Sequence, residues 1–321
     1  MRQAMSVQAP DAVVMVRPHH FASNPQTAAD NASQRVAAGG DQQSGSAQAI
    51  ATRAYREVTE AAQTLQAHGV RVHLFEDDVP GRTPDAVFPN NWFSTHAGGH
   101  VALYPMYSPN RRLERRADVI EMLKAQYRVQ DVIDYSGLEA DQLFLEGTGA
   151  MVLDHVARVA YTVRSNRANA IALERFATHF NFEPMAFDAA DTQGRAVYHT
   201  NVLMCVATDF AMVGFDMITD PMRRAEIRAR LAESGRAIID LSSAQIGEFA
   251  GNALELSSAQ GRVLALSSRA MASLLPAQIA AIERSARLVP LSVPTIELAG
   301  GSVRCMLAGI HLAKRPVAGP A

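Results

Sequence analysis

Residues 146–180, EGTGAMVLDHVARVAYTVRSNRANAIALERFATHF, contain the structural unit that recurs along this 321-residue chain. Two short apolar runs, 150–153 and 159–162, predict a pair of strands, and the helical spacing over 167–180 predicts a helix after them. About five rounds of strand, strand, helix and strand can be counted along the chain. The alternation predicts an α/β fold.

Outside this unit, no long linker rich in Pro, Gly or Ser interrupts the pattern. We therefore expect one continuous α/β domain over residues 11–314, with loose termini at 1–10 and 315–321. Helices are predicted over 47–68 and 243–250, the second with Ser242 and Gln245 as a capping box. Strands are predicted over 195–205 and about 303–312.

The charge balance and the cysteine content exclude several classes of protein. Lys and Arg number 30 against 32 Asp and Glu, whereas nucleic-acid and membrane-surface proteins carry a basic excess. Two cysteines, Cys205 and Cys305, are too few for a secreted disulfide framework, and no Cys/His cluster suggests zinc. No apolar stretch has the length of a signal peptide core or a membrane span. We expect a reduced, cytoplasmic protein.

Cys305 and His199 are the candidates for nucleophilic chemistry. Cys305 lies in AGGSVRCMLAGI (299–310), where the glycines allow the backbone to approach a ligand closely. A buried cysteine is otherwise an inert small apolar residue, which is our interpretation of Cys205. A thiol nucleophile needs a proton acceptor, and His199 in AVYHTNVLMCV (196–206) is the best placed of the ten histidines. The alternative is a structural histidine in a strand.

Two further segments place carboxylates and amides next to apolar runs. Glu146 lies in the glycine-rich turn LEGTG (145–149), as a turn residue or as a functional carboxylate. Asp85, Asn90 and Asn91 lie in PDAVFPNNW (84–92). Short polar side chains in such a frame can also bond a loop backbone, so this interpretation stays open.

Taken in order, PDAVFPNN, EGTG, VRSNR, VYHTN and GGSVRC resemble the pentein superfamily of guanidino-group-modifying enzymes. This superfamily includes arginine deiminase, dimethylarginine dimethylaminohydrolase and the amidinotransferases. The segments VMVRPHHFASNPQTAADN (14–31) and GEFAGNALEL (247–256) are similar to its bacterial branch called amidinotransferase-like or citrulline-utilisation hydrolase. The resemblance implies a five-bladed pseudo-symmetric α/β propeller of ββαβ-type units, with the active site in the central channel.

The resemblance also implies roles for individual residues. It makes Cys305 the nucleophile, His199 the general acid and base, and Glu146 a carboxylate that contacts the substrate and supports the histidine. Asp85 matches a carboxylate that contacts the amino-acid head group. Two arginines match residues that hold the substrate carboxylate: Arg164, eighteen residues after Glu146, and Arg111, with Arg112 as its neighbouring alternative.

Asn90 and Asn91 depart from the pattern, because dimethylarginine hydrolases have acidic residues at these two positions. A buried guanidinium needs anionic acceptors, since a buried unpaired charge costs several kcal/mol. Asparagine is neutral and offers both an acceptor and a donor, which complements a ureido group. The departure therefore favours citrulline over arginine as the substrate, although Glu146 is still acidic.

We predict a hydrolase of non-peptide amidine or ureido C–N bonds that converts citrulline into ornithine, carbon dioxide and ammonia through a covalent Cys305 intermediate. Three alternatives stay open: a hydrolase of arginine or dimethylarginine, an amidinotransferase with the same Cys-His-Glu site, and a non-catalytic binding protein. We expect no metal or organic cofactor. The expected partner is a small amino acid, with no nucleic acid or membrane, and a homodimer is left open.

Overall fold

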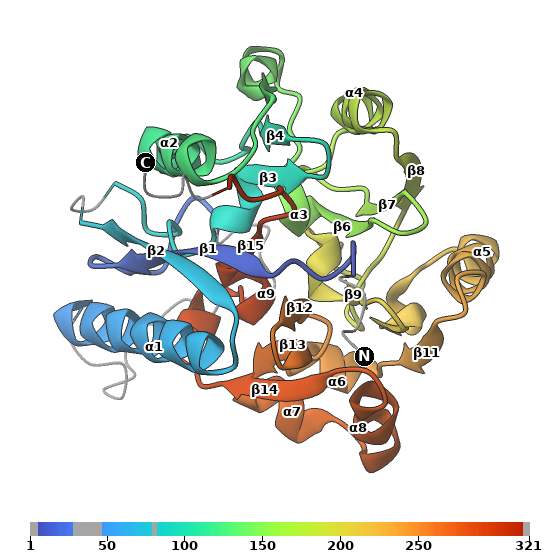
Figure 1. Cartoon of the computed structure of the whole chain (residues 1–321). Coiled ribbons are helices and arrows are strands. Elements are labelled where there is room, and N and C mark those ends of the chain that lie inside the picture. Colours follow the sequence, from blue (N-terminus) through green and yellow to red (C-terminus); the bar gives the residue numbers. More distant parts are fainter. Residues whose placement is uncertain (1–5, 28–46, 79–81, 317–321) are drawn as a thin grey trace.

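The computed structural model describes residues 6–27, 47–78 and 82–316. Within these ranges, five three-stranded sheets surround a common axis, and the longer helices lie outside them (Figure 1). In each sheet the middle strand is antiparallel to the inner strand and parallel to the outer strand. The expected α/β fold with five blades is confirmed.

The sheets follow the order of the chain, except that the first one joins its two ends. From inner to outer strand, the first sheet contains β15 (Ala308–Gly309), β1 (Ala12–Pro18) and β2 (Arg71–Asp77), and the second contains β3 (Phe93–His96), β4 (His100–Leu103) and β5 (Asp131–Asp134). The third contains β6 (Met151–Asp154), β7 (Val159–Val163) and β8 (Glu183–Phe187), and the fourth contains β9 (Met204–Val206), β10 (Phe210–Val213) and β11 (Ala237–Asp240). The fifth contains β12 (Leu254–Ser258), β13 (Gly261–Ser267) and β14 (Arg287–Leu291).

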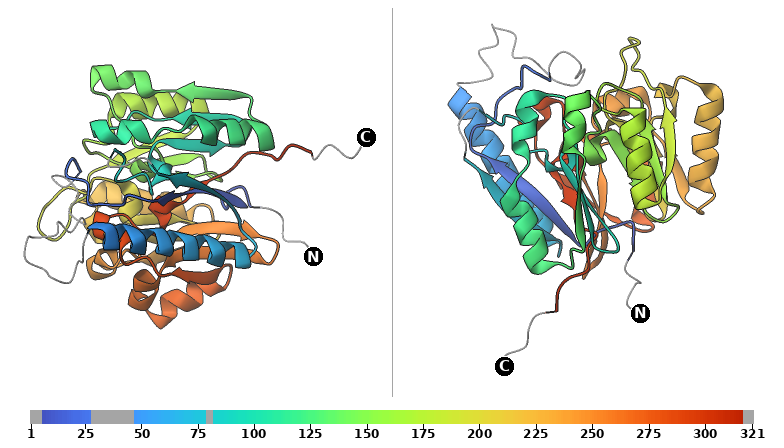
Figure 2. Two further views of the ribbon diagram at one scale, coloured as in Figure 1. Left: turned by 90° about the vertical axis from the view of Figure 1, so that its left-hand side faces the viewer. Right: turned by 90° about the horizontal axis from the view of Figure 1, so that it is seen from above.

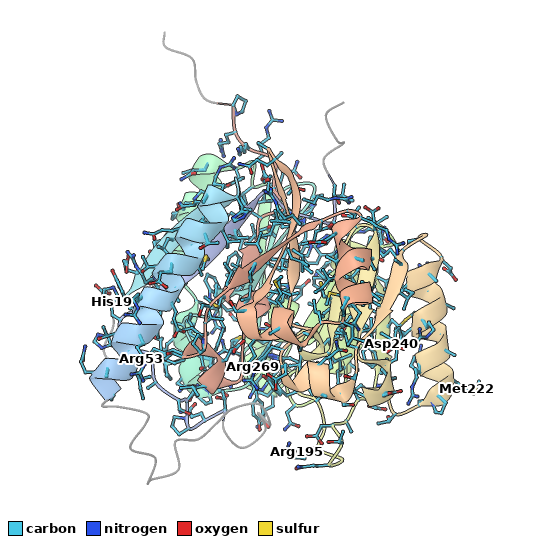
Figure 3. All side chains as sticks on the ribbon, turned by 90° about the horizontal axis from the view of Figure 1, so that it is seen from below. His19, Arg53, Arg195, Met222, Asp240 and Arg269 are labelled. Atoms are coloured by element: carbon cyan, nitrogen blue, oxygen red, sulfur yellow. The ribbon has the colours of Figure 1, made fainter. Side chains whose placement is uncertain are left out.

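Helices connect the middle strand to the outer strand in every sheet, because a parallel pair needs a long crossover. They are α1 (Ala47–Ala67), α2 (Ala117–Gln126), α4 (Ala170–Phe180), α5 (Pro221–Ala232), and α7 (Ser268–Ser273) with α8 (Pro276–Glu283). The two helices α1 and α5 lie on opposite sides of the molecule (Figure 2). Long polar side chains such as Arg53 and Arg195 cover the outer surface, where Met222 is also exposed (Figure 3).

The helix and cap predictions are confirmed with small changes in length. Helix α1 buries Ala54, Val58, Ala61 and Leu65 on one face and is followed by Gly69, whose φ of +81° suits glycine. Ser242 and Gln245 form the predicted capping box at the start of α6 (Ser243–Gly247), a shorter helix than expected.

The core lies between the sheets and the outer helices, and the inner strands enclose the axis. Every residue of β6 and β7 is buried, as expected for strands covered on both faces. Neighbouring sheets are also joined by a buried ion pair, in which Arg236 donates to both carboxylate oxygens of Asp154. This pair connects the start of β11 to the end of β6.

The described part of the N-terminus is not the loose end that we expected. Gln8 is buried, and its Nε2 donates to the carbonyl oxygens of Leu153 and Val206 at 3.0 and 2.9 Å. Ordered structure thus begins before residue 11, because this amide bonds two neighbouring sheets. The outermost parts of the predicted termini, 1–5 and 317–321, lie outside the described residues. None of the helices in the described ranges has the length and apolar character needed to cross a bilayer.

Candidate active site

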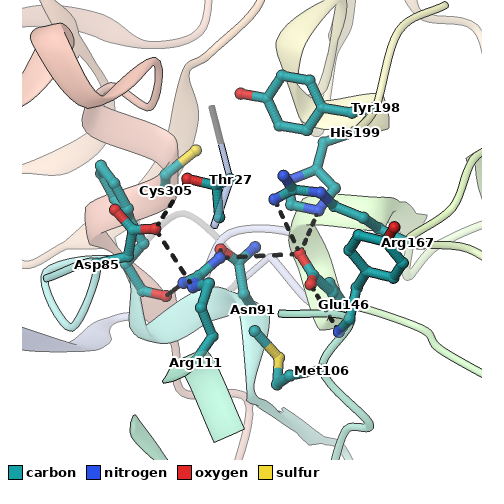
Figure 4. Close-up of polar contacts among 12 residues, drawn as sticks. Thr27, Asp85, Asn91, Met106, Arg111, Glu146, Arg167, Tyr198, His199 and Cys305 are labelled. Carbon is teal, nitrogen blue, oxygen red and sulfur yellow. Dashed lines mark hydrogen bonds and ion pairs between the residues drawn. The ribbon is translucent and has the colours of Figure 1, made fainter. Parts of the chain in front are cut away.

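Short helical turns lie before four of the five inner strands and bring distant segments together. They are η1 (Pro89–Asn91) before β3, α3 (Gly147–Ala150) before β6, η4 (Thr200–Val202) before β9 and α9 (Val303–Met306) before β15. Because the inner strands surround the axis, these turns meet at one end of it. A small pocket at this end is lined by Cys305, His199, Asp85, Asn91 and Arg111, among others (Figure 4).

Cys305 is buried in α9, and its sulfur contacts two amide groups. The Nδ2 atoms of Asn201 and Asn252 donate to Sγ at 3.2 and 3.3 Å. The preceding Gly301 packs on the ring of Phe88, since a Cβ on this glycine would lie 2.6 Å from the ring. This glycine therefore allows the close approach of the Phe88 ring, which lines the same pocket.

The strands predicted around the two candidate residues are wrong at their beginnings. Residues 303–306 form a helical turn, and the strand β15 that follows has two residues. Likewise 200–202 form η4, and β9 starts only at Met204. Apolar runs of this length fit a buried helical turn as well as a strand, so periodicity alone does not separate them.

His199 and Glu146 form a buried pair, and His199 lines the same pocket as Cys305. Nε2 of His199 lies 2.8 Å from Oε2 of Glu146, and the side chains are 4% and 0% exposed. A carboxylate can only accept, so Nε2 carries the hydrogen and Nδ1 is the acceptor. Nδ1 would lie 2.9 Å from a Cβ on Gly149, so the glycine makes room for the imidazole.

The electrostatic surroundings keep this pair as a neutral imidazole and a carboxylate. Burial lowers the pKa of His199, and the hydrogen bond to Glu146 opposes this effect only in part. Burial by itself raises the pKa of Glu146, but the charge of Arg167 and the hydrogen bond from His199 together lower that pKa well below its usual value. The backbone N–H of Tyr107 also donates to Oε1 of Glu146, at 3.1 Å.

Arg111, and not Arg112, faces the pocket. Its Nε and Nη2 atoms donate to the buried carboxylate of Glu114, and its Nη1 donates to Oδ1 of Asn91 at 2.9 Å. Arg112 instead bonds the carbonyl oxygen of Met106 near the surface. Most donors of Arg111 are therefore already used within the protein.

The structure does not bring Arg164, a predicted site residue, into the pocket. Its side chain is 53% exposed and pairs with Asp188 at 3.2 Å, because its backbone continues the pairing of β7 with β8 at the surface. Arg167 takes the place in the pocket: it is buried, lies 3.4 Å from Glu146 and stacks over the ring of Tyr198. The turn after β7 brings it there, since the carbonyl oxygen of Arg167 accepts from the backbone N–H of Glu146.

Asp85 lies in the pocket, as expected. Its Oδ2 accepts from Nδ2 of Asn24 at 2.7 Å and lies 3.8 Å from Nε of Arg111. Its Oδ1 is buried and has no hydrogen-bond partner among the described residues. One carboxylate oxygen is therefore available to a bound ligand.

The two neighbouring asparagines do not both face the pocket. Asn91 lines it: its Oδ1 is held by Arg111, and its buried Nδ2 has no partner among the described residues. Asn90 is fully buried and is not among the residues that line this pocket, and its amide oxygen and nitrogen have no hydrogen-bond partner among the described residues. Consecutive residues of a 3₁₀ turn point about 120° apart, which separates the two side chains.

The described residues contain no group of three or more His, Cys, Asp or Glu side chains arranged to hold a metal ion.

A family model described as N,N dimethylarginine dimethylhydrolase, eukaryotic, matches residues 17–312. The chain belongs to this family. It is accordingly a hydrolase of amidine C–N bonds that uses a cysteine nucleophile.

Solved structures share the fold of this dimethylargininase-family chain. The N-terminal domain of ArgZ, an arginine dihydrolase from the ornithine–ammonia cycle in cyanobacteria, has a TM-score of 0.71 at 17% identity, over 93% of this chain and 97% of that one. Unliganded AgrE has a TM-score of 0.70 at 19% identity, over 95% of this chain and 40% of that one. The chain thus spans about two fifths of AgrE.

A dimethylarginine dimethylaminohydrolase, in an adduct with S-methyl-L-thiocitrulline, has a TM-score of 0.60 at 13% identity. That match covers 94% of this chain and 100% of the other. The fold is therefore the five-bladed pentein propeller, as the resemblance implied. No curated protein sequence matches the chain.

Several residues of the pocket were missed by sequence reasoning. Arg167 and Tyr198 lie within motifs quoted for the family resemblance, VRSNR and VYHTN, but nothing marked them individually. Asn201 is the last residue of VYHTN, and Asn252 lies within GEFAGNALEL. Both side chains contact the sulfur of Cys305. The recurrence of Asn just before an inner strand is a signal that could have found them.

Proposed function

We propose that this dimethylargininase-family enzyme hydrolyses the guanidino group of free arginine or an N-methylated arginine, with Cys305 as nucleophile and His199 as general acid and base. The observation that carries the proposal is that Cys305 and His199 line one pocket, and that His199 is bonded to the buried carboxylate of Glu146. Since the site residues come from turns of separate sheets, we also propose that residues 11–314 act as one catalytic domain.

The charges of the pocket support an amino-acid substrate with a cationic side chain. The carboxylate of Glu146, held in its charged form and bonded to His199, adds negative charge next to the pocket and so favours a guanidinium there. The unpartnered Oδ1 of Asp85 is placed to accept from the α-ammonium group. We assign the α-carboxylate to Arg167, because this buried arginine lines the pocket and lies over the ring of Tyr198. Arg111 is then a positioning residue for Asn91.

The reaction proceeds in two halves. The Cys305 thiol gives its proton to Nδ1 of His199, and the thiolate attacks the guanidino carbon to form a C–S bond. His199 returns this proton to the departing nitrogen, so the C–N bond breaks and ammonia or a methylated amine leaves. Water then gives a proton to His199 and adds to the thiouronium carbon. The C–S bond breaks, Cys305 leaves as a thiol with citrulline, and His199 releases its proton to solvent.

A substrate panel tests the proposal. The protein is assayed with arginine, monomethylarginine, dimethylarginine and citrulline, and ammonia, methylamines, citrulline and ornithine are measured separately. Cys305→Ser is expected to abolish turnover, and Cys205→Ala is the matched control, since Cys205 is a buried cysteine outside the pocket. Full turnover by Cys305→Ser would refute the role of this sulfur.

Citrulline is the second candidate substrate, and one contact favours it. Arg111 can only donate, so it fixes Oδ1 of Asn91 toward itself and leaves Nδ2 as a donor in the pocket. A donor suits the oxygen of a ureido group and does not suit the N–H groups of a guanidinium. The same attack on citrulline would release ornithine, with carbon dioxide and ammonia from the carbamoyl group. In the panel, ornithine formed from citrulline decides for this candidate.

Amidino transfer is tested in the same assay. A transferase would pass the amidino group to an added amine such as glycine instead of water. Product diverted from citrulline to a guanidino compound of the added amine would support transfer, and an unchanged yield of citrulline supports hydrolysis.

A further inference from the structure

The five inner strands begin in the same way, and the equivalent positions form a ring at the pocket. The residue two or three positions before the strand is Asn91 for β3, Gly149 for β6, Asn201 for β9, Asn252 for β12 and Cys305 for β15. The turns pack backbone against backbone. A Cβ on Gly251 would lie 2.6 Å from the carbonyl oxygen of Val202, and one on Gly147 would lie 2.5 Å from that of Asn90. Such close packing holds these residues at one level of the axis.

Asn252 is held in a single orientation within this ring. The backbone N–H of Arg304 can only donate, and Oδ1 of Asn252 accepts from it at 3.0 Å. Its Nδ2 therefore faces the other way and donates to the carbonyl oxygen of Asn201 at 3.0 Å and to Sγ of Cys305 at 3.3 Å. Asn252 thus joins the turn that contains Asn201 to the turn that contains Cys305, and its amide also reaches the sulfur.

Asn201 provides the second donor, at 3.2 Å from Sγ. Both asparagines are buried, with exposed fractions of 0% and 1%, so these contacts are shielded from water. The Oδ1 of Asn201 has no partner among the described residues. Two amide N–H groups therefore converge on one sulfur atom in a water-poor site.

We propose that Asn201 and Asn252 are catalytic residues that stabilise and aim the thiolate of Cys305. A hydrogen bond to a charged acceptor is stronger than one to a neutral acceptor, so two N–H donors favour the thiolate over the thiol. Amide groups stabilise the thiolate without placing a full positive charge next to a cationic guanidinium substrate. This advantage rests on the proposed function, because it applies only to a guanidinium substrate. When the C–S bond forms, the negative charge leaves the sulfur and these contacts weaken.

Alkylation of Cys305 by iodoacetamide tests the proposal without any substrate. The rate at Cys305 is followed by mass spectrometry from pH 5 to pH 10, with Cys205 in the same digest as an internal reference. Asn252→Asp keeps the acceptor for Arg304 but removes the donor. At pH 7 the rate is expected to fall about tenfold or more.

Asn201→Ala is expected to lower the alkylation rate at pH 7 as well, which covers the case in which Asn252→Asp does not fold. The matched control is Asn169→Asp, which lies outside the pocket and keeps an equally good cap on α4. Wild-type alkylation rates at Cys305 in the folded variants would overturn the proposal. Lowered alkylation rates in these variants of a protein that hydrolyses none of the panel would support these roles and refute the proposed function alone.

Discussion

Nε2 of His199 and Oε2 of Glu146 lie 2.8 Å apart in a region that excludes water. This contact fixes the imidazole tautomer, so that Nδ1 is the atom left to exchange protons. It also links the turn before β6 to the turn before β9, two segments that are separated by 53 positions in the sequence.

Glu146→Gln is expected to lower kcat/KM by about 10²–10⁴-fold, the range that general acid–base catalysis contributes. The amide of glutamine no longer fixes the tautomer or stabilises the imidazolium that forms during turnover. Because the bond to Glu146 raises the pKa of His199, the acidic limb of the activity profile should also move to lower pH. Glu121→Gln, on the surface of α2, is the control and should leave the profile unchanged.

Gly149→Ala is expected to remove most of the activity while the protein stays folded. The added Cβ would lie 2.1 Å from Nδ2 of Asn91 and 2.9 Å from Nδ1 of His199, so both side chains must move. Gly137→Ala is the matched control, since a Cβ there meets nothing within 4 Å. Initial rates and circular dichroism of both variants check this prediction, and a fully active Gly149→Ala would contradict the geometry of the pocket.

Arg167→Ala is expected to raise KM by about tenfold or more, because a hydrogen bond to a charged group contributes about 1.5–3 kcal/mol. Arg164→Ala should change KM by less than about twofold, since its surface ion pair with Asp188 contributes little. Steady-state kinetics on the two variants compare them directly. The reverse order would support the original sequence-based assignment of Arg164.

Acidification is expected to destabilise the fold through His311. Burial lowers the pKa of His311 to about 4, and the charge of Arg304 contributes to this shift. The unfolded chain therefore binds the proton at a higher pH than the folded one, near 6.5. The free energy of unfolding should fall between about pH 6.5 and pH 4, by up to about 3 kcal/mol for this residue.

Urea unfolding at pH 7.5 and pH 5.0 measures this effect. His311→Asn cannot titrate, so its loss of stability on acidification should be smaller than that of the wild type. The exposed His20 provides the control variant, His20→Asn, which should behave as the wild type does. Equal pH dependence in all three proteins would rule out a contribution from His311.

The sequence alone determined the α/β class and the five units, and it pointed to Cys305, His199 and Glu146 as candidate site residues. These features depend on local alternation of apolar residues and on ordered motifs, both of which can be seen along the chain. The capping box at Ser242 was predictable for the same reason, because it involves residues three positions apart.

Only the tertiary structure decided which side chains point to the axis. Arg164 and Arg167 are three residues apart in one motif, and the path of the turn after β7 sends the first to the surface and the second into the pocket. Asn90 and Asn91 are separated in the same way by one step of a 3₁₀ turn. The amide contacts of Asn201 and Asn252 with Cys305 connect three sheets over separations of 104 and 53 positions. Such contacts arise from the packing of turns around the axis, which local patterns do not specify.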